Sequence, residues 1–358
     1  MVARLSRRTI LSLIGGAAVA AAVPGVALAE RRLRLPAGTV IRTVMGDLNP
    51  DALSGGATLF HEHLSLGDDF IPKAITLLRA EGNATVPKET VLGPPHDLHL
   101  MLAELAAARR EGVACIVDAG HADMGRDLKF LKQPSTRSGM PIVAGFGFYA
   151  EPFYPPLLAE WSEAQIVREL VNQARSQPVG VFGEIGTWHD MSDLERKVFR
   201  AVGRAHLETN LPIFTHTDYG KGAMQQLDLF EEIGVHPARV VIGHVGGLSD
   251  PRADVAMAIC KRGAFVGYDR QGGPGDSMQL PAVLALLEAG FADNLLFASD
   301  FALAPDLQRN GGPGYAKTLT VFVPKLRQAG VSEEVLKRIL VDNPRRFLAC
   351  IPKVPRGG

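Results

Sequence analysis

Two histidines, His61 and His63, stand two residues apart at the end of an apolar, β-prone run that begins at Ala57. Side chains alternate between the two faces of a strand, so both imidazoles point one way while Glu62 points the other. Two imidazoles about 6–7 Å apart on one strand face make half of a metal site. Two unrelated histidines near a strand end are the competing interpretation. The metal hypothesis therefore depends on ligands from other strands.

Four further residues of metal-ligating type follow at later strand ends. Glu184 is a lone carboxylate in the apolar run Val181–Ile185, where an unpaired charge would cost several kcal/mol. His216 and His244 end two consecutive strand candidates, and Asp300 follows the last one. A buried salt bridge is the alternative role for Glu184, and a hydrogen-bonded core position is the alternative for a single histidine. The repetition at successive strand ends favours metal ligands.

The combined set contains four imidazoles and two carboxylates: His61, His63, Glu184, His216, His244 and Asp300. These donors suit zinc, with manganese, cobalt or iron as alternatives. Six ligands are too many for one open catalytic zinc, but they fit two divalent ions that share a bridging carboxylate and a bridging hydroxide. Two such ions lower the pKa of the shared water toward about 7, and Asp300 would orient this nucleophile and accept its proton. The sequence therefore predicts hydrolysis of an ester, a lactone or a phosphoester.

The composition is that of an ordinary globular protein. The chain has 358 residues, of which 46% are hydrophobic and 21% charged, and its formal net charge is zero. This balance gives no support for nucleic acid or a membrane surface as the main partner, so we expect a small-molecule substrate. Three widely spaced cysteines without a CxxC pair argue against a disulfide framework and a thiolate zinc site, and favour buried free thiols. The oligomeric state stays open, with a homodimer as one option.

A targeting segment occupies residues 1–29. The motif SRRTIL at residues 6–11 is a twin-arginine signature, the apolar run Leu11–Val26 follows it, and Ala27–Ala29 form a small-residue cleavage site. The apolar run is short and rich in Gly and Ala, which makes a transmembrane anchor the weaker interpretation. We therefore expect a twin-arginine signal peptide and a periplasmic or secreted protein.

From residue 57 onward, short apolar runs alternate with stretches of helical periodicity. The strand candidates are Ala57–Leu64, Ala114–Ala119, Pro141–Phe148, Gly180–Ile185, Pro212–His216, Arg239–His244, Ala264–Tyr268 and Asn294–Ser299. The helix candidates are Leu98–Glu111, Ala164–Ala174, Asp193–Glu208, Gly222–Ile233, Asp250–Lys261, Leu280–Ala289 and Tyr315–Gln328.

Eight strands alternating with helices predict parallel strands joined by crossover helices. An open doubly-wound sheet fits the number of strands almost as well. The polar residues at the C-terminal ends of the strands favour a (β/α)8 TIM-type barrel of the metal-dependent hydrolase kind, because that is where barrel enzymes place their active sites. We expect residues 57–358 to form this single-domain barrel, and residues 30–56 to close its bottom as an N-terminal segment, for which a small hairpin is one option.

The chain resembles the phosphotriesterase family of the amidohydrolase superfamily, and most of all its phosphotriesterase homology branch. The resemblance extends from about Thr58 to the end of the chain. It rests on His61-Glu62-His63, Glu184-Ile185-Gly186, Thr215-His216-Thr217, Gly243-His244, Ser299-Asp300, the run Gly311–Tyr315 and the closing segment Asp342–Phe347. The resemblance implies that His61, His63 and Asp300 hold the more buried metal, and that His216 and His244 hold the more exposed one.

One position departs from the best-known members of that family. They bridge their two metals with a carboxylated lysine on the fourth strand, where this chain has Glu184, as in the phosphotriesterase homology branch. Both groups carry one negative charge and two oxygens, so the electrostatics of a bridge are kept. Glutamate is several bonds shorter, which does not favour efficient organophosphate hydrolysis, and it forms a bridge without carbon dioxide.

Loops at the barrel mouth supply the candidates for substrate contacts. Tyr149 matches a position that in lactone-hydrolysing relatives points at the metal-bound water or the substrate, although an aromatic residue that only fills the barrel top fits too. Arg270 resembles the arginine of an Asp-Arg pair in those lactonases; it would orient a carbonyl or a polar tail, or it would only pair with Asp269. For His121 and His189, which also follow strands, we expect surface roles.

Tyr149 and Arg270 favour an ester or lactone as substrate, with organophosphate hydrolysis as a side activity. Three alternatives stay open. One is a phosphoester hydrolase, acting on phosphotriesters or phosphodiesters. Another is a non-catalytic periplasmic metal- or ligand-binding barrel, which would be marked by a missing ligand. The third is an amidase or deaminase on the same superfamily fold, although deaminases usually need one metal and no bridging carboxylate such as Glu184.

Overall fold

The computed structural model describes residues 33–82, 92–248 and 250–355. The expected signal peptide at residues 1–29 lies outside the described residues and stays a prediction. Among the helices of the described ranges, none is long and apolar enough to cross a membrane. Cys115, Cys260 and Cys350 are free and buried, as the sequence predicted.

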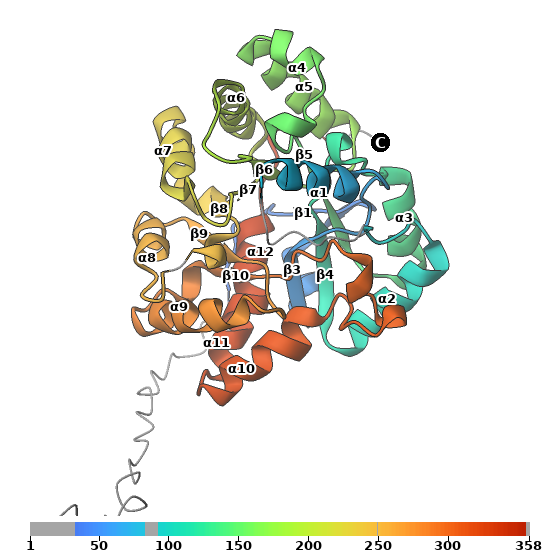
Figure 1. Cartoon of the computed structure of the whole chain (residues 1–358), viewed down its shortest axis with the longest axis vertical. Coiled ribbons are helices and arrows are strands. Elements are labelled where there is room, and N and C mark those ends of the chain that lie inside the picture. The colour runs from blue at the N-terminus through green and yellow to red at the C-terminus, as the bar shows by residue number, and fades with distance from the viewer. Residues whose placement is uncertain (1–32, 83–91, 249, 356–358) are drawn as a thin grey trace, which may run out of the picture. The chain divides into compact units, whose positions relative to one another are not determined.

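Eight parallel strands form one sheet in chain order, from β3 to β10 (Figure 1). Their bounds are β3 Ala57–Glu62, β4 Val113–Asp118, β5 Ile142–Phe146, β6 Val181–Gly186, β7 Ile213–His216, β8 Val240–Ile242, β9 Phe265–Tyr268 and β10 Leu295–Phe297. At the C-terminal ends of β10 and β3, the N–H of Asp300 donates to the carbonyl of His61 at 3.1 Å, and the N–H of His63 donates to that of Phe301 at 3.0 Å. These bonds bring the first and last strands together, and the prediction of a (β/α)8 barrel is confirmed.

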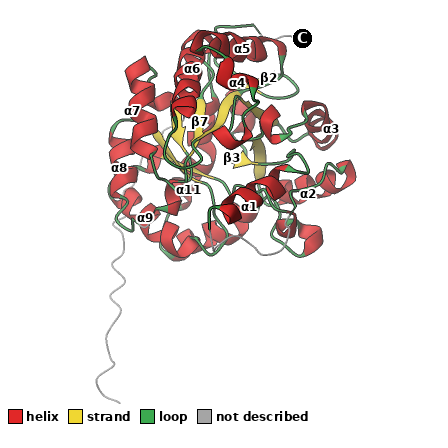
Figure 2. Cartoon of the chain, turned by 45° about the horizontal axis from the view of Figure 1, so that its top comes forward, coloured by secondary structure: helices red, strands yellow, loops and turns green. Residues whose placement is uncertain are grey.

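Helices surround the strands, as Figure 2 shows in red and yellow. Their bounds are α1 Phe70–Ala80, α2 Leu98–Arg110, α3 Leu128–Ser138, α4 Leu157–Glu160, α5 Glu163–Ser176, α6 Asp193–Thr209, α7 Ala223–Ile233, α8 Asp254–Lys261, α9 Asp276–Glu288, α10 Val323–Gln328, α11 Glu333–Lys337 and α12 Asn343–Leu348. The two long helices on one side, α5 and α6, each begin with a capping box, Ser162 with Gln165 and Ser192 with Glu195.

Each strand contributes to two separate parts of the core because its side chains alternate between faces. Phe60 and Phe214 belong to a cluster inside the barrel, whereas Leu59 and Ile213, one residue earlier on the same strands, pack in the layer with the helices. On β7 this alternation carries from Phe214 to His216, which points into the barrel mouth. On β3 the register shifts between Leu59 and Glu62, so His61 points into the mouth although it directly follows the inward-facing Phe60.

Three predicted helices begin three or more residues away from the observed start. The helix expected over Asp250–Lys261 begins only at Asp254, because Ala253 has a left-handed backbone with φ of 57°. The helix expected from Leu280 begins earlier, at Asp276, whose carboxylate accepts the N–H of Gly272 at 2.9 Å. The last one, expected to start at Tyr315, consists of a π-helical turn over Thr318–Phe322 followed by α10.

A short hairpin, β1 Ile41–Arg42 with β2 Asp47–Leu48, precedes the barrel. The N–H of Val44 in its turn donates to the carbonyl of Ile142 at 2.8 Å, at the N-terminal end of β5. The guanidinium of Arg42 donates to the carbonyl of Ala174, in the last turn of α5. The hairpin therefore lies at the end of the barrel opposite the strand ends that carry the histidines.

Glu62 lies on the other face of β3 from His61 and binds β3 to the segment after β10, where the barrel closes. Its fully buried carboxylate accepts hydrogen bonds from the backbone N–H of Ser299 at 2.9 Å, from the Ser299 hydroxyl at 2.8 Å, and from the N–H of Phe301 at 2.8 Å. Asp300 lies between these two residues. The carboxylate of Glu62 thus fixes the backbone on both sides of a candidate metal ligand.

Glu62→Gln tests this function. The amide group keeps the size of the side chain but offers only one acceptor oxygen, so at least one buried N–H loses its partner, at about 1–3 kcal/mol for each such group. We expect the free energy of unfolding of the metal-free protein in urea to fall by that amount. Glu208→Gln, on the exposed face of α6, is the control. Equal losses in both variants would contradict the proposed closure.

Candidate metal centre

The six predicted ligands lie together at the C-terminal end of the barrel. Their donor atoms form two groups, each with all atoms within 4.8 Å of one another. The first group contains His61, His63, Glu184 and Asp300, and the second contains Glu184, His216 and His244. Glu184 belongs to both groups, so its carboxylate lies between two sets of imidazoles.

The first group joins the two ends of the barrel sheet. The Nε2 atom of His63 lies 3.2 Å from Oδ1 of Asp300 and 3.3 Å from Oε1 of Glu184. The Nε2 atom of His61 lies 3.5 Å from Oδ1 of Asp300 and 3.4 Å from Oε2 of Glu184. The second group is as compact, since Nδ1 of His216 lies 2.8 Å from Oε2 of Glu184 and 2.9 Å from Nε2 of His244.

This arrangement has too few protons for its acceptors. His61 and His244 each place Nδ1 within 3.0 Å of the Asp269 carboxylate, so a neutral ring donates from Nδ1 and keeps a lone pair on Nε2. Both Nε2 atoms face the Glu184 carboxylate at 3.4 Å, and that of His61 has no hydrogen-bond partner among the described residues. Lone pairs that face a buried carboxylate need a cation between them, so the residues present fit divalent metal ions.

The pKa shifts of the candidate ligands also indicate that this cluster stabilises positive charge. Burial lowers the pKa of His61, but the charges of Glu184 and Asp300 outweigh burial and raise it well above its ordinary value. Burial raises the pKa of Glu184, yet its attraction to His61 and His216 holds that pKa well below the usual range. Burial lowers the pKa of His216 to about 4, which keeps its ring in the neutral form that a metal ligand requires.

Two of the ligands have a left-handed backbone, with φ of 57° at His244 and 49° at Asp300. Such a conformation costs a residue other than glycine of order 1–3 kcal/mol and persists where surrounding contacts impose it, typically at functional sites. The residue before His244 is Gly243, and a Cβ there would come within 2.1 Å of the Thr215 carbonyl. Close packing between β7 and β8 therefore fixes the direction of the His244 side chain.

Tyr149 and Arg270 both reach the cluster. The hydroxyl of Tyr149 lies 3.2 Å from Nε2 of His216, and its ring is buried. The Nε–H of Arg270 donates to Oδ2 of Asp300 at 3.1 Å. Arg270 thus pairs with a candidate metal ligand, and not with the neighbouring Asp269 as one of the sequence interpretations had it.

The expectation of a surface role is wrong for His121 and fits His189. His121 is fully buried, its pKa is lowered to about 3 by burial, and its Nδ1 lies 3.7 Å from Oδ1 of Asp123. Its burial depends on the fold of the loop after β4, which strand-end spacing does not reveal. The imidazole of His189 is half exposed and lies between the carboxylates of Glu81 and Asp218, at 3.0 and 3.3 Å.

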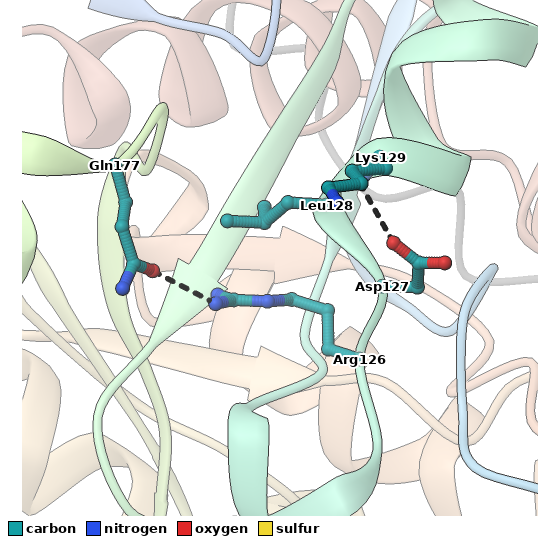
Figure 3. Close-up of a pocket in the computed structure, with 5 residues that line it drawn as sticks. All are labelled: Arg126, Asp127, Leu128, Lys129 and Gln177. Atoms are coloured by element: carbon teal, nitrogen blue, oxygen red, sulfur yellow. Dashed lines mark hydrogen bonds between the residues drawn. The ribbon is translucent and has the colours of Figure 1, made fainter.

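The same loop after β4 also borders a shallow surface pocket (Figure 3). There the Arg126 guanidinium donates to the side chain of Gln177 at 3.2 Å, and Asp127 caps the start of α3. None of the six candidate ligands lines this pocket. This pocket is therefore separate from the candidate metal centre.

Comparison with known proteins agrees with the geometry. The model of the phosphotriesterase family matches residues 39–348. The chain belongs to the phosphotriesterase family.

Individual relatives support this assignment. The chain is 28% identical to an N-acetyltaurine hydrolase from Salmo salar, with 86% of this chain and 97% of that protein aligned. The crystal structure of the phosphotriesterase homology protein from Escherichia coli, with phosphate in its active site, has a TM-score of 0.72 at 28% identity and covers 82% of this chain and 99% of that one. A lactonase from Listeria monocytogenes has a TM-score of 0.74 at 26% identity and covers 86% of this chain and 98% of that one. With its metal-ligand cluster, this phosphotriesterase-family chain is a metal-dependent hydrolase.

Asp269 is a residue of this site whose role the sequence did not reveal. Its fully buried carboxylate lies 3.0 Å from Nδ1 of His61 and 2.8 Å from Nδ1 of His244, and it also accepts the backbone N–H of His244 at 3.0 Å. One carboxylate therefore fixes the tautomer and the orientation of two ligands from different strands. Its position at the end of β9 was the available signal, but its proximity to Arg270 in sequence suggested a simpler ion pair.

Asp269→Asn tests this positioning function. The amide can accept only one of the two Nδ1–H groups, and its NH2 group opposes the other. Loss of such an outer hydrogen bond typically weakens metal binding by about 10–100-fold, and we expect a loss in this range when metal affinity is measured by competition with a fluorescent chelator. Asp254→Asn, at an exposed aspartate on α8, is the matched control. Unchanged metal affinity in Asp269→Asn would contradict the assignment.

Proposed function

We propose that this chain hydrolyses carboxylic esters or lactones with two divalent metal ions, with zinc as the expected metal. The observation that carries the proposal is the shared position of Glu184 between two groups of imidazoles at the mouth of the barrel. His61, His63 and Asp300 would hold one ion and His216 and His244 the other, with Glu184 common to both. Because the bridging group is an ordinary carboxylate, assembly of the site needs metal but no carbon dioxide.

When bound, the two ions lower the pKa of a water molecule toward about 7 and polarise the carbonyl oxygen of the substrate. The protein groups do the rest. Asp300 has the most exposed carboxylate of the cluster, at 16% against 3% for Glu184, so it can accept the proton of the attacking water. Arg270 orients this carboxylate through its Nε–H, and the Tyr149 hydroxyl, beside His216, can donate to the substrate oxygen.

Two features support an acyl carbon as the reaction centre in preference to phosphorus. Glu184 replaces the longer carboxylated lysine found in the best-known organophosphate hydrolases of the family. Tyr149, at the position noted for lactone-hydrolysing relatives, is held 3.2 Å from His216. Organophosphate hydrolysis would then be a side activity.

Hydrolysis of an N-acyl amide is the second candidate. Relatives named N-acetyltaurine hydrolase align with this chain over 97% of their own length. An amide needs a protonated leaving amine, and Asp300 could return the proton that it takes from the water. The same residues would therefore catalyse both reactions. Comparing the rates with ester and amide substrates distinguishes the two candidates.

We also propose that the protein is exported through the twin-arginine pathway to the periplasm or beyond. The paired Arg7 and Arg8, followed by an apolar run, support this location. That pathway carries folded proteins, which suits a barrel that acquires its metals before export.

An assay of the metal-replete protein against lactones, aryl esters, N-acyl amides, phosphodiesters and a paraoxon-type phosphotriester tests the proposed function. We expect the best lactone or ester to exceed the phosphotriester by roughly tenfold or more in kcat/KM, because the site favours an acyl carbon. Asp300→Asn should lower the rate by about 10²–10⁴-fold, since it cannot accept a proton. An N-acyl amide as the best substrate would establish the second candidate, and a phosphotriester faster than every acyl substrate would contradict both.

A further inference from the structure

Tyr149 and Arg270 lie on opposite sides of the metal-ligand cluster. Tyr149 follows β5 and Arg270 follows β9, and four strand positions separate β5 from β9 in the eight-stranded order. Tyr149 lies against His216, whereas Arg270 lies against Asp300. A substrate whose scissile bond occupies the cluster therefore has one part directed toward the β5 side and another toward the β9 side.

The β5 side is apolar and closed. Phe70, Ile71 and Ile75 of α1 pack in one cluster with Tyr149 and Phe153, and each is at most 9% exposed. The rings of Phe70 and Phe153 are 4.8 Å apart between centroids, and those of Phe70 and Tyr149 are 5.6 Å apart. A charged part of a substrate would lose its hydration among these rings. The ammonium of Lys73, which lies over the Phe153 ring at 4.7 Å, already donates to the carbonyl of Pro152 at 2.9 Å. The β5 side therefore favours an uncharged group.

The β9 side is open and cationic. The Arg270 side chain is 31% exposed, more than that of any of the six ligands, which reach at most 16%. Its Nε–H is used by Asp300, and within the described ranges its two Nη groups have no hydrogen-bond partner. The guanidinium lies over the ring of Tyr219 at 4.6 Å, and the carbonyl of Arg270 accepts a hydrogen bond from Gln279. Its planar fork is therefore held in place with two donor groups unused.

The charges around the loaded site nearly cancel, apart from Arg270 on the β9 side. Two divalent ions would bring four positive charges and Arg270 a fifth, whereas Glu184, Asp300, Asp269 and a hydroxide nucleophile would bring four negative ones, and the carboxylates of Glu62 and Asp118 lie buried behind the ligands. Next to Tyr219, the carboxylate of Asp218 is already paired with Lys221 at 2.9 Å and with His189 at 3.3 Å. Asp218 therefore does not compete for Arg270, whose guanidinium stays available to an anionic group of a substrate.

We propose that Arg270 binds an acidic group of the substrate, a carboxylate or a sulfonate, so that the enzyme prefers acyl compounds whose leaving group is negatively charged. A planar guanidinium with two free donor groups matches the two oxygens of such an anion. This assignment rests on the proposed acyl hydrolysis at the same site. It makes Arg270 the residue that determines specificity on the leaving-group side.

Matched substrates test the proposal. The compounds 3-(hexanoyloxy)benzoate, 3-(hexanoyloxy)benzenesulfonate and methyl 3-(hexanoyloxy)benzoate share the scissile ester and differ in charge. A charged hydrogen bond formed in a partly buried site supports a preference of roughly 10–100-fold. We expect the two anionic esters to exceed the methyl ester by that factor in kcat/KM, mainly through a lower KM.

Arg270→Gln should bring the ratio of anionic to methyl ester close to one, and Arg270→Lys should restore part of it. Arg252→Gln, at an exposed arginine before α8, is the matched control and should keep the wild-type ratio. A wild-type ratio near one, or a ratio that Arg270→Gln leaves unchanged, would overturn the proposal.

A binding experiment separates recognition from reaction. The ether 3-(hexyloxy)benzoate and its methyl ester cannot be hydrolysed at the ether position. Calorimetry measures their affinity for the metal-replete protein directly, and mass spectrometry of the cell contents checks that the methyl ester group has stayed intact. If the acid binds more tightly than its methyl ester and Arg270→Gln abolishes this difference, the proposal is supported, even if none of the three esters is hydrolysed. Failure of all three esters to react would refute the proposed acyl ester hydrolysis and leave the binding role of Arg270 intact. Equal affinity of acid and methyl ester would overturn the proposal even if the esters were hydrolysed.

Discussion

The carboxylate of Glu184 lies within 2.8–3.4 Å of nitrogens from four histidines, and this contact is the constraint on which the site depends. His61 and His63 approach it from β3, and His216 and His244 from β7 and β8. Two of these rings donate Nδ1–H to Asp269 and so offer lone pairs, not protons, to Glu184. A buried negative charge surrounded by lone pairs is stable only with cations between them. The fold therefore assembles a site that demands positive charge.

Three further buried carboxylates hold this assembly together. Asp269 orients two of the imidazoles, and Glu62 binds the backbone on both sides of Asp300. Asp118, at the end of β4, accepts the N–H groups of Leu64 and Ser65 directly after His63. Each of these carboxylates joins strand ends that are far apart in sequence. The geometry of the ligands thus depends on hydrogen bonds that the ligands themselves do not make.

The sequence predicted the barrel and the convergence of the six candidate ligands because both follow from one rule: the C-terminal ends of parallel strands meet. His216 and His244 are 28 residues apart, yet their ring nitrogens are 2.9 Å apart for this reason. The role of Asp269 and the burial of His121 could not be predicted in the same way, because they depend on side-chain contacts between loops. The predicted helix limits were wrong where a single backbone angle determines the start of the helix, as at Ala253.

The metal content of the protein tests the central claim most directly. Elemental analysis of the purified, metal-replete protein should give two divalent ions per chain. His216→Ala removes a ligand of one ion only and should give one ion per chain, provided that circular dichroism shows an intact fold. A firm stoichiometry of one in the wild-type protein, unchanged in His216→Ala, would contradict a site in which Glu184 joins two ions.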